Sequence, residues 1–261
     1  MIKLKTKKEI EVMKEGGRRL KEVVRELRPQ IKAGMTTAQI DKIAESLIVK
    51  KGGQPSFKKV RDYFWSTCLT VNEQIVHTPP SAKVLKTGDI LTVDIGIYYK
   101  GFHTDYADTV AIGKIDVEII KFLAKGKKTL DLAIKKLKIG NRLGQISQVI
   151  EKEITGAGYS IVKELTGHGI GRELHEDPYI PGFLDRTEKQ TPTIKPGLVI
   201  AVEVIYSLGS GEMMHETENN WSIRTSDSSL SACFEHTVAV TYEPEQSSLQ
   251  GETDTNTIIL T

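Results

Sequence analysis

Acidic residues inside apolar, β-branched segments are the feature that most constrains this chain. Four such acids occur: Asp94, Asp105, Glu203 and Glu235. A carboxylate in an apolar strand costs free energy unless it is paired or bound to a metal. Each acid therefore needs a partner, and the four together predict that strands from distant parts of the chain meet at one charged centre.

Helical and β-rich segments alternate along the chain. The pattern Thr6–Glu9 predicts a capping box, and apolar residues then recur at helical spacing as far as Pro29. A second helix is predicted from Thr37 to the glycines at 52–53, and a β-rich region covers 68–112. Two further helices are predicted over 116–137 and 143–155, before a second β-rich region. This order predicts an α/β (α+β) fold with two halves of similar topology, each a helix pair packed on antiparallel strands.

The 261 residues suffice for one large domain or two small ones. Because no linker rich in Pro, Gly or Ser separates the halves, we expect a single domain over residues 1–261. The polar segment Pro244–Thr257 is predicted to be a loop before a last strand, 257–261.

Charge and composition exclude several classes of protein. The 36 basic and 34 acidic residues give a net charge of +2, which offers no electrostatic case for a nucleic-acid partner. We find no membrane-spanning run and no signal-peptide pattern. Only Cys68 and Cys233 are present, so no disulfide framework exists and a cytoplasmic location is expected.

The first two acids are predicted to share one face of a hairpin. If Lys100 and Gly101 form a two-residue loop, Asp105 lies opposite Gly96. Asp94 then lies diagonal to Asp105 on the same face, at roughly 7 Å, and a cation fits between them. Asp108 faces the other side of the strand, where we expect a structural role.

Simpler explanations exist for each acid taken alone. Asp94 would also suit a loop cap or a lysine partner, and Glu203 and Glu235 would suit paired structural acids. The group is more informative than its members: four carboxylates carry −4, which two divalent cations would neutralise.

Two histidines lie in the glycine-rich segment Thr166–Pro178. The glycines around His168 are expected to let the backbone turn sharply and approach a ligand, and they argue against a helix carrying both His168 and His175. A single histidine is often only a satisfied polar residue. Oxygen-rich ligation with one imidazole favours manganese, iron(II) or cobalt, and two metals sharing a hydroxide provide a nucleophile at neutral pH.

The order of these residues resembles the type I methionine aminopeptidases in their short bacterial form. The motifs Gly-His-Gly-Ile-Gly around His168 and Phe-Glu-His-Thr around Glu235 carry the resemblance, which extends from the first helix to the last strand. It implies a pita-bread fold, whose two pseudo-symmetric halves cup two divalent metal ions (cobalt, manganese or iron(II)). By this resemblance Asp94 chelates one metal, Asp105 and Glu235 bridge both, and His168 and Glu203 complete the other.

The same resemblance implies a metalloaminopeptidase that removes the N-terminal methionine of nascent proteins and peptides, preferentially before a small second residue. A metal-bridging hydroxide would attack the peptide carbonyl, with Glu203 as proton shuttle. His77 would contact the substrate near the scissile amide nitrogen, and His175 would bond the scissile carbonyl oxygen. The positions that line the methionine pocket in the family are Cys68, Tyr63 and Trp221.

Four departures from the family pattern leave the strictness of methionine selection open. Val60 replaces an aromatic residue, Leu174 replaces phenylalanine, Thr78-Pro79-Pro80 replaces a glycine-containing turn, and Val204 replaces proline. None of them removes a predicted metal ligand.

Two other functions are compatible with parts of this pattern. A Pro-directed aminopeptidase or prolidase shares the five ligands but usually carries an extra N-terminal domain, for which the 76 residues before His77 leave little room. A catalytically dead binding module of this fold typically loses metal ligands, whereas all five positions are filled here. Lysines 3, 5, 7 and 8 would suit transient ribosome contact, although a solvated helix face is the expected explanation.

Overall fold

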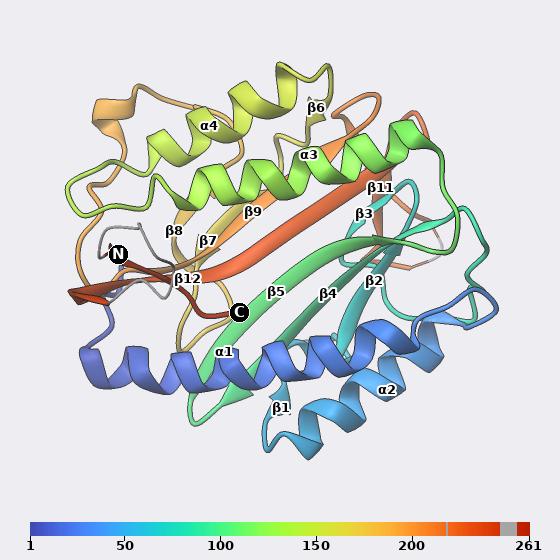
Figure 1. Cartoon of the computed structure of the whole chain (residues 1–261), viewed down its shortest axis with the longest axis horizontal. Helices are drawn as coiled ribbons and strands as arrows, with labels where there is room; N and C mark the ends of the chain where they lie inside the picture. Colours follow the sequence, from blue (N-terminus) through green and yellow to red (C-terminus); the bar gives the residue numbers. More distant parts are fainter. Residues whose placement is uncertain (218, 246–254) are drawn as a thin grey trace.

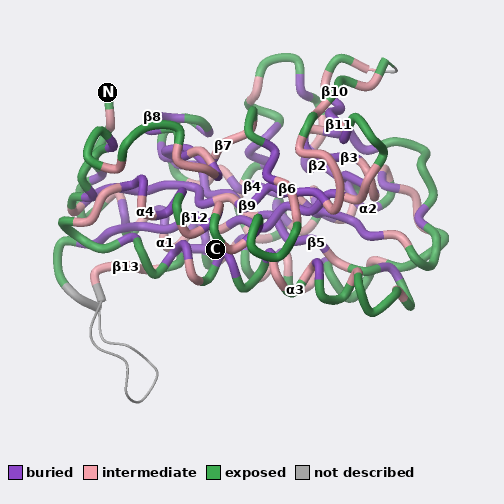
Figure 2. The backbone as a smooth tube through the Cα atoms, turned by 90° about the horizontal axis from the view of Figure 1, so that it is seen from above, coloured by how far each residue is buried: buried purple, intermediate pink, exposed green. Residues whose placement is uncertain are grey.

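A large antiparallel sheet covered by two pairs of helices forms the body of the protein. The computed structural model describes residues 1–217, 219–245 and 255–261. Helices α1 (Lys7–Leu27) and α2 (Thr37–Lys50) belong to the first half, and α3 (Val117–Ile134) and α4 (Gly144–Thr155) to the second. Helices α1 and α3 both lie across one face of the sheet, α1 over the strands of the first half and α3 over those of the second (Figure 1). The view from above shows β10 and β11 on the side opposite these helices (Figure 2).

The helix starts follow from local chemistry. Thr6 and Glu9 form the predicted capping box at α1, and Thr36 with Gln39 forms another at α2. Short 3₁₀ turns lie at 28–30, 57–59 and 188–190. All four predicted helices are confirmed, with bounds within a few residues of those expected.

The main sheet joins strands from both halves. Its path runs β1 (Gln54–Pro55), β4 (Ile90–Tyr99), β5 (Phe102–Ala111), β12 (Ser231–Glu245), β9 (Val199–Ser207), β7 (Thr166–Gly169) and β8 (Glu176–Pro181). Three further strands pair beside this path: β2 (Thr67–Val71) with β4, β6 (Ser160–Ile161) with β9, and β13 (Thr255–Ile259) with β12. A smaller sheet holds β10 (Met213–His215), β11 (Ile223–Thr225) and β3 (Gln74–Val76).

The predicted hairpin register is confirmed. Gly96 pairs with Asp105, and Asp94 pairs with Ala107 two positions further on. Side chains of residues two apart share a face, so both carboxylates project to the side of the sheet opposite α1 and α3. Strand β12 then joins the halves, since Glu235 pairs with Ala107 on β5 and with Glu203 on β9.

Each half has its own apolar core. One buried cluster packs α1 and α2 on β2 and β4, and a second packs α3 and α4 on β9 and β12. A third cluster contains residues of both halves, among them Met13, Cys68 and Val199. The two halves of similar topology are therefore observed as predicted.

Two details differ from the sequence-based expectations or lie beyond the description. Lys5 is buried and not part of a solvated helix face, because it precedes α1 and its ammonium pairs with Glu176. Most of the predicted loop Pro244–Thr257 lies outside the described residues, and β13 begins at Thr255, two residues before the strand expected there. Within the described chain, no helix is both long and apolar enough to cross a membrane.

Candidate metal centre

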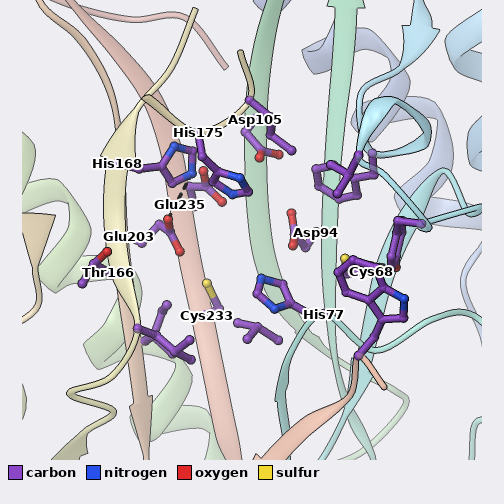
Figure 3. A pocket seen from close by; sticks show the side chains of 18 of the residues that line it. Cys68, His77, Asp94, Asp105, Thr166, His168, His175, Glu203, Cys233 and Glu235 are labelled. Atoms are coloured by element: carbon purple, nitrogen blue, oxygen red, sulfur yellow. Dashed lines mark hydrogen bonds and ion pairs between the residues drawn. The ribbon is translucent and has the colours of Figure 1, made fainter. Parts of the chain in front are cut away.

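Five strands deliver the predicted ligands to one place. Asp94 comes from β4, Asp105 from β5, His168 from β7, Glu203 from β9 and Glu235 from β12. Figure 3 shows their side chains facing a common cavity. Because these strands lie next to one another in the sheet, residues far apart in sequence become neighbours.

Three of the ligand atoms already lie close enough to share an ion. One donor atom each of Asp105, His168 and Glu235 falls within 4.8 Å of the others. The Nε2 atom of His168 lies 3.4 Å from Oε1 of Glu203. Asp94 lies on the first-half side of the cavity, close to Cys68 in Figure 3.

His168 is oriented as a metal ligand. Its Nδ1–H donates to the carbonyl of Gly169 at 2.8 Å, which leaves the Nε2 lone pair directed at the carboxylates. Burial lowers the pKa of His168 to about 3, so the ring is neutral at pH 7. A neutral imidazole with its second nitrogen held by a carbonyl is the usual form of a metal-binding histidine.

The glycines beside His168 have a different role from the one expected. His168 lies in strand β7 and not in a turn. A Cβ on Gly167 would lie 2.6 Å from the carbonyl oxygen of Ala201, and one on Gly169 would lie 2.2 Å from that of Asp177. These glycines therefore let β7 fit between β8 and β9, which places the imidazole but does not open a path for a ligand.

The carboxylates strongly oppose one another's ionisation. Burial, followed by the charges of neighbouring acids, raises the pKa of Asp94, Glu203 and Glu235 well above ordinary values. Burial raises the pKa of Asp105 to about 7. No lysine or arginine is among the described residues that line the cavity, so no protein cation offsets these charges.

The residues fit a divalent metal. Oδ1 of Asp94 and Oε1 of Glu235 are buried and have no hydrogen-bond partner in the described structure. An unsatisfied buried carboxylate oxygen is costly, and a cation is the partner that four acids and an imidazole would jointly accept. The donor set, mostly oxygen with one nitrogen, suits manganese, iron or cobalt better than a thiolate zinc site.

An apolar chamber adjoins the ligands. The cavity has a volume of about 260 Å³, and its wall includes the three predicted pocket residues, Cys68, Tyr63 and Trp221. The Tyr63 ring meets the Trp221 ring edge-on at 5.1 Å, and its hydroxyl lies 3.1 Å from the Cys68 sulfur. The structure therefore brings these side chains together beside the carboxylates.

The two other histidines predicted for the site, His77 and His175, line the same cavity. His77 follows β3 with a φ of 60°, and burial lowers its pKa to about 4. The His175 ring lies 4.4 Å from the His168 ring, and burial also lowers its pKa. Both rings are neutral at pH 7, so each offers one N–H donor and one acceptor nitrogen.

The departures from the family pattern fall in two environments. Val60 and Leu174 line the cavity, as expected of residues that shape its wall. Val204 lies in the core behind the sheet, because it alternates with Glu203 along β9. Asp108 is on the far side from the cavity, as predicted, and pairs with Arg28 at 3.0 Å.

Among the cavity residues that the sequence analysis did not point to, two follow a simple pattern. Cys233 and Ile205 line the cavity, and each lies two residues from a predicted ligand on the same strand, Glu235 and Glu203 respectively. The period of two along a strand was the signal that would have found them.

Comparison with known proteins agrees with this geometry. The sequence profile of Metallopeptidase family M24 matches residues 11–242. Methionine aminopeptidase 1 of Bacillus subtilis is 39% identical over 241 residues, which cover 92% of this chain and 96% of that protein. The crystal structure of a methionine aminopeptidase from Thermotoga maritima superposes with a TM-score of 0.91 at 34% identity. The match covers 100% of this chain and 99% of that one.

The chain belongs to Metallopeptidase family M24, whose metallopeptidase chemistry implies a divalent metal. Within that family it is an enzyme of the methionine aminopeptidase type, as its relatives at 32–39% identity show. A prolidase from Pyrococcus furiosus has the same pita-bread fold, with a TM-score of 0.76 at 20% identity, and the match covers 98% of this chain and 64% of that one.

Proposed function

We propose that the chain removes N-terminal methionine from peptides and nascent proteins, preferentially when the second residue is small. The observation that carries this proposal is the cavity itself, in which an apolar chamber adjoins five metal-type ligands. Methionine is apolar and flexible, and its thioether contacts aromatic rings and thiols favourably. Cys68, Tyr63 and Trp221 offer such a surface beside the site of reaction.

For the ligands, we propose two divalent ions per chain. Asp105 and Glu235 would lie between both ions, Asp94 would bind one, and His168 with Glu203 would bind the other. Four negative charges against two divalent ions give a neutral centre. When bound, such ions lower the pKa of water and polarise the peptide carbonyl.

The protein groups supply positioning and proton transfer. Glu203 would act as the proton shuttle, because a carboxylate beside the reacting groups can accept a proton and return it. His175 donates a hydrogen bond to the scissile carbonyl oxygen, and this bond strengthens as negative charge develops there. His77 contacts the substrate near the scissile nitrogen, where its neutral ring offers either a donor or an acceptor.

The test compares peptides that differ in one residue. Protein loaded anaerobically with manganese, iron(II) or cobalt should release methionine from Met-Ala-Ser and leave Leu-Ala-Ser and Ala-Pro-Ser intact. Metal content measured on the same samples identifies the ion and the number bound. Full activity after chelation, or a preference for Xaa-Pro peptides, would refute the proposal.

For cellular context, we propose that the chain acts in the cytoplasm on nascent chains. Cys68 and Cys233 are buried free thiols, which fits a reducing compartment. Transient ribosome contact would use Lys3, Lys7 and Lys8, since Lys5 is buried. Unchanged co-sedimentation with ribosomes at low salt after replacement of those three lysines would contradict that contact.

A further inference from the structure

A buried cation from the N-terminal segment reaches the back of the loop that carries His175. The Nζ atom of Lys5 donates to Oε2 of Glu176 at 2.7 Å, and the two side chains are 5% and 2% exposed. Desolvating both charges is expensive, and a buried pair is therefore weak evidence of a role in stability alone. The neighbours of this pair indicate what else it does.

Glu176, which follows the loop, hydrogen-bonds through its carboxylate to the backbone near the start of the loop. Its Oε1 accepts from the backbone N–H of Arg172 at 2.9 Å and from that of Glu173 at 3.2 Å. Both amides lie in the segment 171–175, which ends at His175. One carboxylate thus uses one oxygen to hold the loop and the other to bind Lys5.

Hydrogen bonds fix the backbone of Lys5, and packing fixes the aliphatic part of its side chain. Its N–H donates to the carbonyl of Gly197 at 2.7 Å, and its carbonyl accepts from the Tyr242 hydroxyl at 3.0 Å. A Cβ on Gly171 would lie 2.3 Å from Cε of Lys5, so the lysine stem packs directly on the loop. The cation therefore has one position, defined by the second half of the molecule.

The same loop is held from the first half. The N–H of His103, on β5, donates to the carbonyl of Gly171 at 2.7 Å, and the N–H of Gly171 donates to the carbonyl of Glu173 at 3.1 Å. In the segment 171–175, Leu174 and His175 make none of these backbone hydrogen bonds, and both side chains line the cavity. The His103 hydrogen bond thus holds the start of the loop, and the hydrogen bonds of Glu176 fix the position of its end relative to that start.

We propose that Lys5, acting through Glu176, is a positioning residue for His175. This inference rests on the proposed function, in which His175 binds the scissile carbonyl oxygen. Lys5 compensates the buried carboxylate that fixes the loop, and the loop in turn holds the imidazole toward the substrate. A catalytic group displaced by about 1 Å can lose roughly 100-fold in rate, so a contact behind the loop affects turnover.

The test uses the variants Lys5→Met and Lys5→Met/Glu176→Gln. Lys5→Met leaves a buried carboxylate unpaired, and kcat for a Met-Ala peptide should fall roughly 10- to 100-fold, with KM and metal content unchanged. In the double variant the glutamine oxygen still accepts from both loop amides without needing a cation, so kcat should recover. Lys8→Met, an exposed lysine of α1, is the matched control and should equal the parent enzyme.

A second readout is independent of turnover. In metal-free protein carrying ¹³C-labelled histidine, the His175 ring signal should shift in Lys5→Met, return in the double variant and stay unchanged in Lys8→Met. If methionine release fails in the parent protein while these shifts occur, the proposed function is wrong and the positioning stands. The proposal would be overturned by an unchanged His175 signal in Lys5→Met or by no recovery in the double variant. It would also be overturned if metal content, KM and kcat all worsened to the same extent in Lys5→Met.

Discussion

At the scale of single residues, Asp105 is the acid on which the centre depends most. It belongs to the closest group of donor atoms, and its charge contributes to the raised pKa of Asp94, Glu203 and Glu235. Gly96 opposite it leaves little space, since a Cβ there would lie 3.2 Å from Oδ1 of Asp105. The position of this carboxylate is therefore set by the hairpin.

We predict that Asp105→Asn removes the capacity to bind two metals. The amide has nearly the shape of the carboxylate but no charge, so it cannot bridge two cations, while the fold loses only a repulsive buried charge. Metal content by elemental analysis and thermal melting would be measured together. Normal metal content in the variant would refute the bridging role.

The matched control for this variant is Asp108→Asn. Asp108 lies on the same strand three residues away, but it faces the other side and pairs with Arg28. This change should leave metal content unaltered and cost at most about 1 kcal/mol, because Arg28 is half-exposed and solvent screens the pair. Metal loss in both variants would indicate general damage to the strand.

At the scale of elements, the contact between α1 and the C-terminal residues is unusually close. A Cβ on Gly17 would lie 2.3 Å from the carbonyl oxygen of Leu260, whereas one on Gly16 would lie 3.4 Å from Cβ of Tyr99. Both glycines are buried in the same helix. They differ in what they face: Gly17 faces the backbone of Leu260, whereas Gly16 faces the side chain of Tyr99 at an ordinary contact distance.

These neighbours make a matched pair of substitutions. Alanine favours helix over glycine by about 1 kcal/mol, so Gly16→Ala should be neutral or slightly stabilising. Gly17→Ala should destabilise by roughly 1–3 kcal/mol, because the backbone near Leu260 must move. Denaturant unfolding of both variants measures the difference, and equal stabilities would contradict the close approach.

Elements whose signals are local could be predicted from the sequence. The Thr6–Glu9 pattern located the start of α1, and the two-residue loop at Lys100 and Gly101 fixed the pairing of Asp105 with Gly96. Both depend on residues a few positions apart, for which capping and turn chemistry suffice.

Pairings between distant segments could not be predicted in this way. The pairing of β12 with β5 and the small sheet of β10, β11 and β3 depend on which faces become buried together. The four acidic ligands were found because acids in apolar strands are conspicuous, and His168 was found from the glycine-rich segment around it. The burial of Lys5 was not found, since its basic surroundings in sequence suggest a solvated surface. Its partner Glu176 lies 171 residues away, and no local pattern connects the two.

At the scale of the whole molecule, the centre and the third apolar cluster join the halves. Strands β5 and β12 pair directly, and the ligands come from both sides of that pairing. We therefore propose that residues 1–261 form one domain. Separate fragments 1–114 and 115–261 should each expose half of the acidic cavity and fail to fold independently, as circular dichroism would show. Cooperative unfolding of either fragment alone would contradict a single domain.

Metal binding should stabilise this entire unit. Only the folded chain assembles the five ligands, so an ion at 100 times its dissociation constant adds about 2.7 kcal/mol to the free energy of unfolding. For a chain of this size that corresponds to a rise in Tm of roughly 5–10 °C. Oδ1 of Asp94 and Oε1 of Glu235, which have no hydrogen-bond partner within the described structure, would gain one from the ion.

The expected result is one calorimetric transition that moves to higher temperature as manganese(II) is added and returns on chelation. The Asp105→Asn variant should show a smaller shift, because one bridging charge is missing. If the halves were independent, only part of the heat absorption would move with the metal. A single transition that shifts as a whole therefore tests both the metal centre and the unity of the fold, since both require ligands from the two halves to act together.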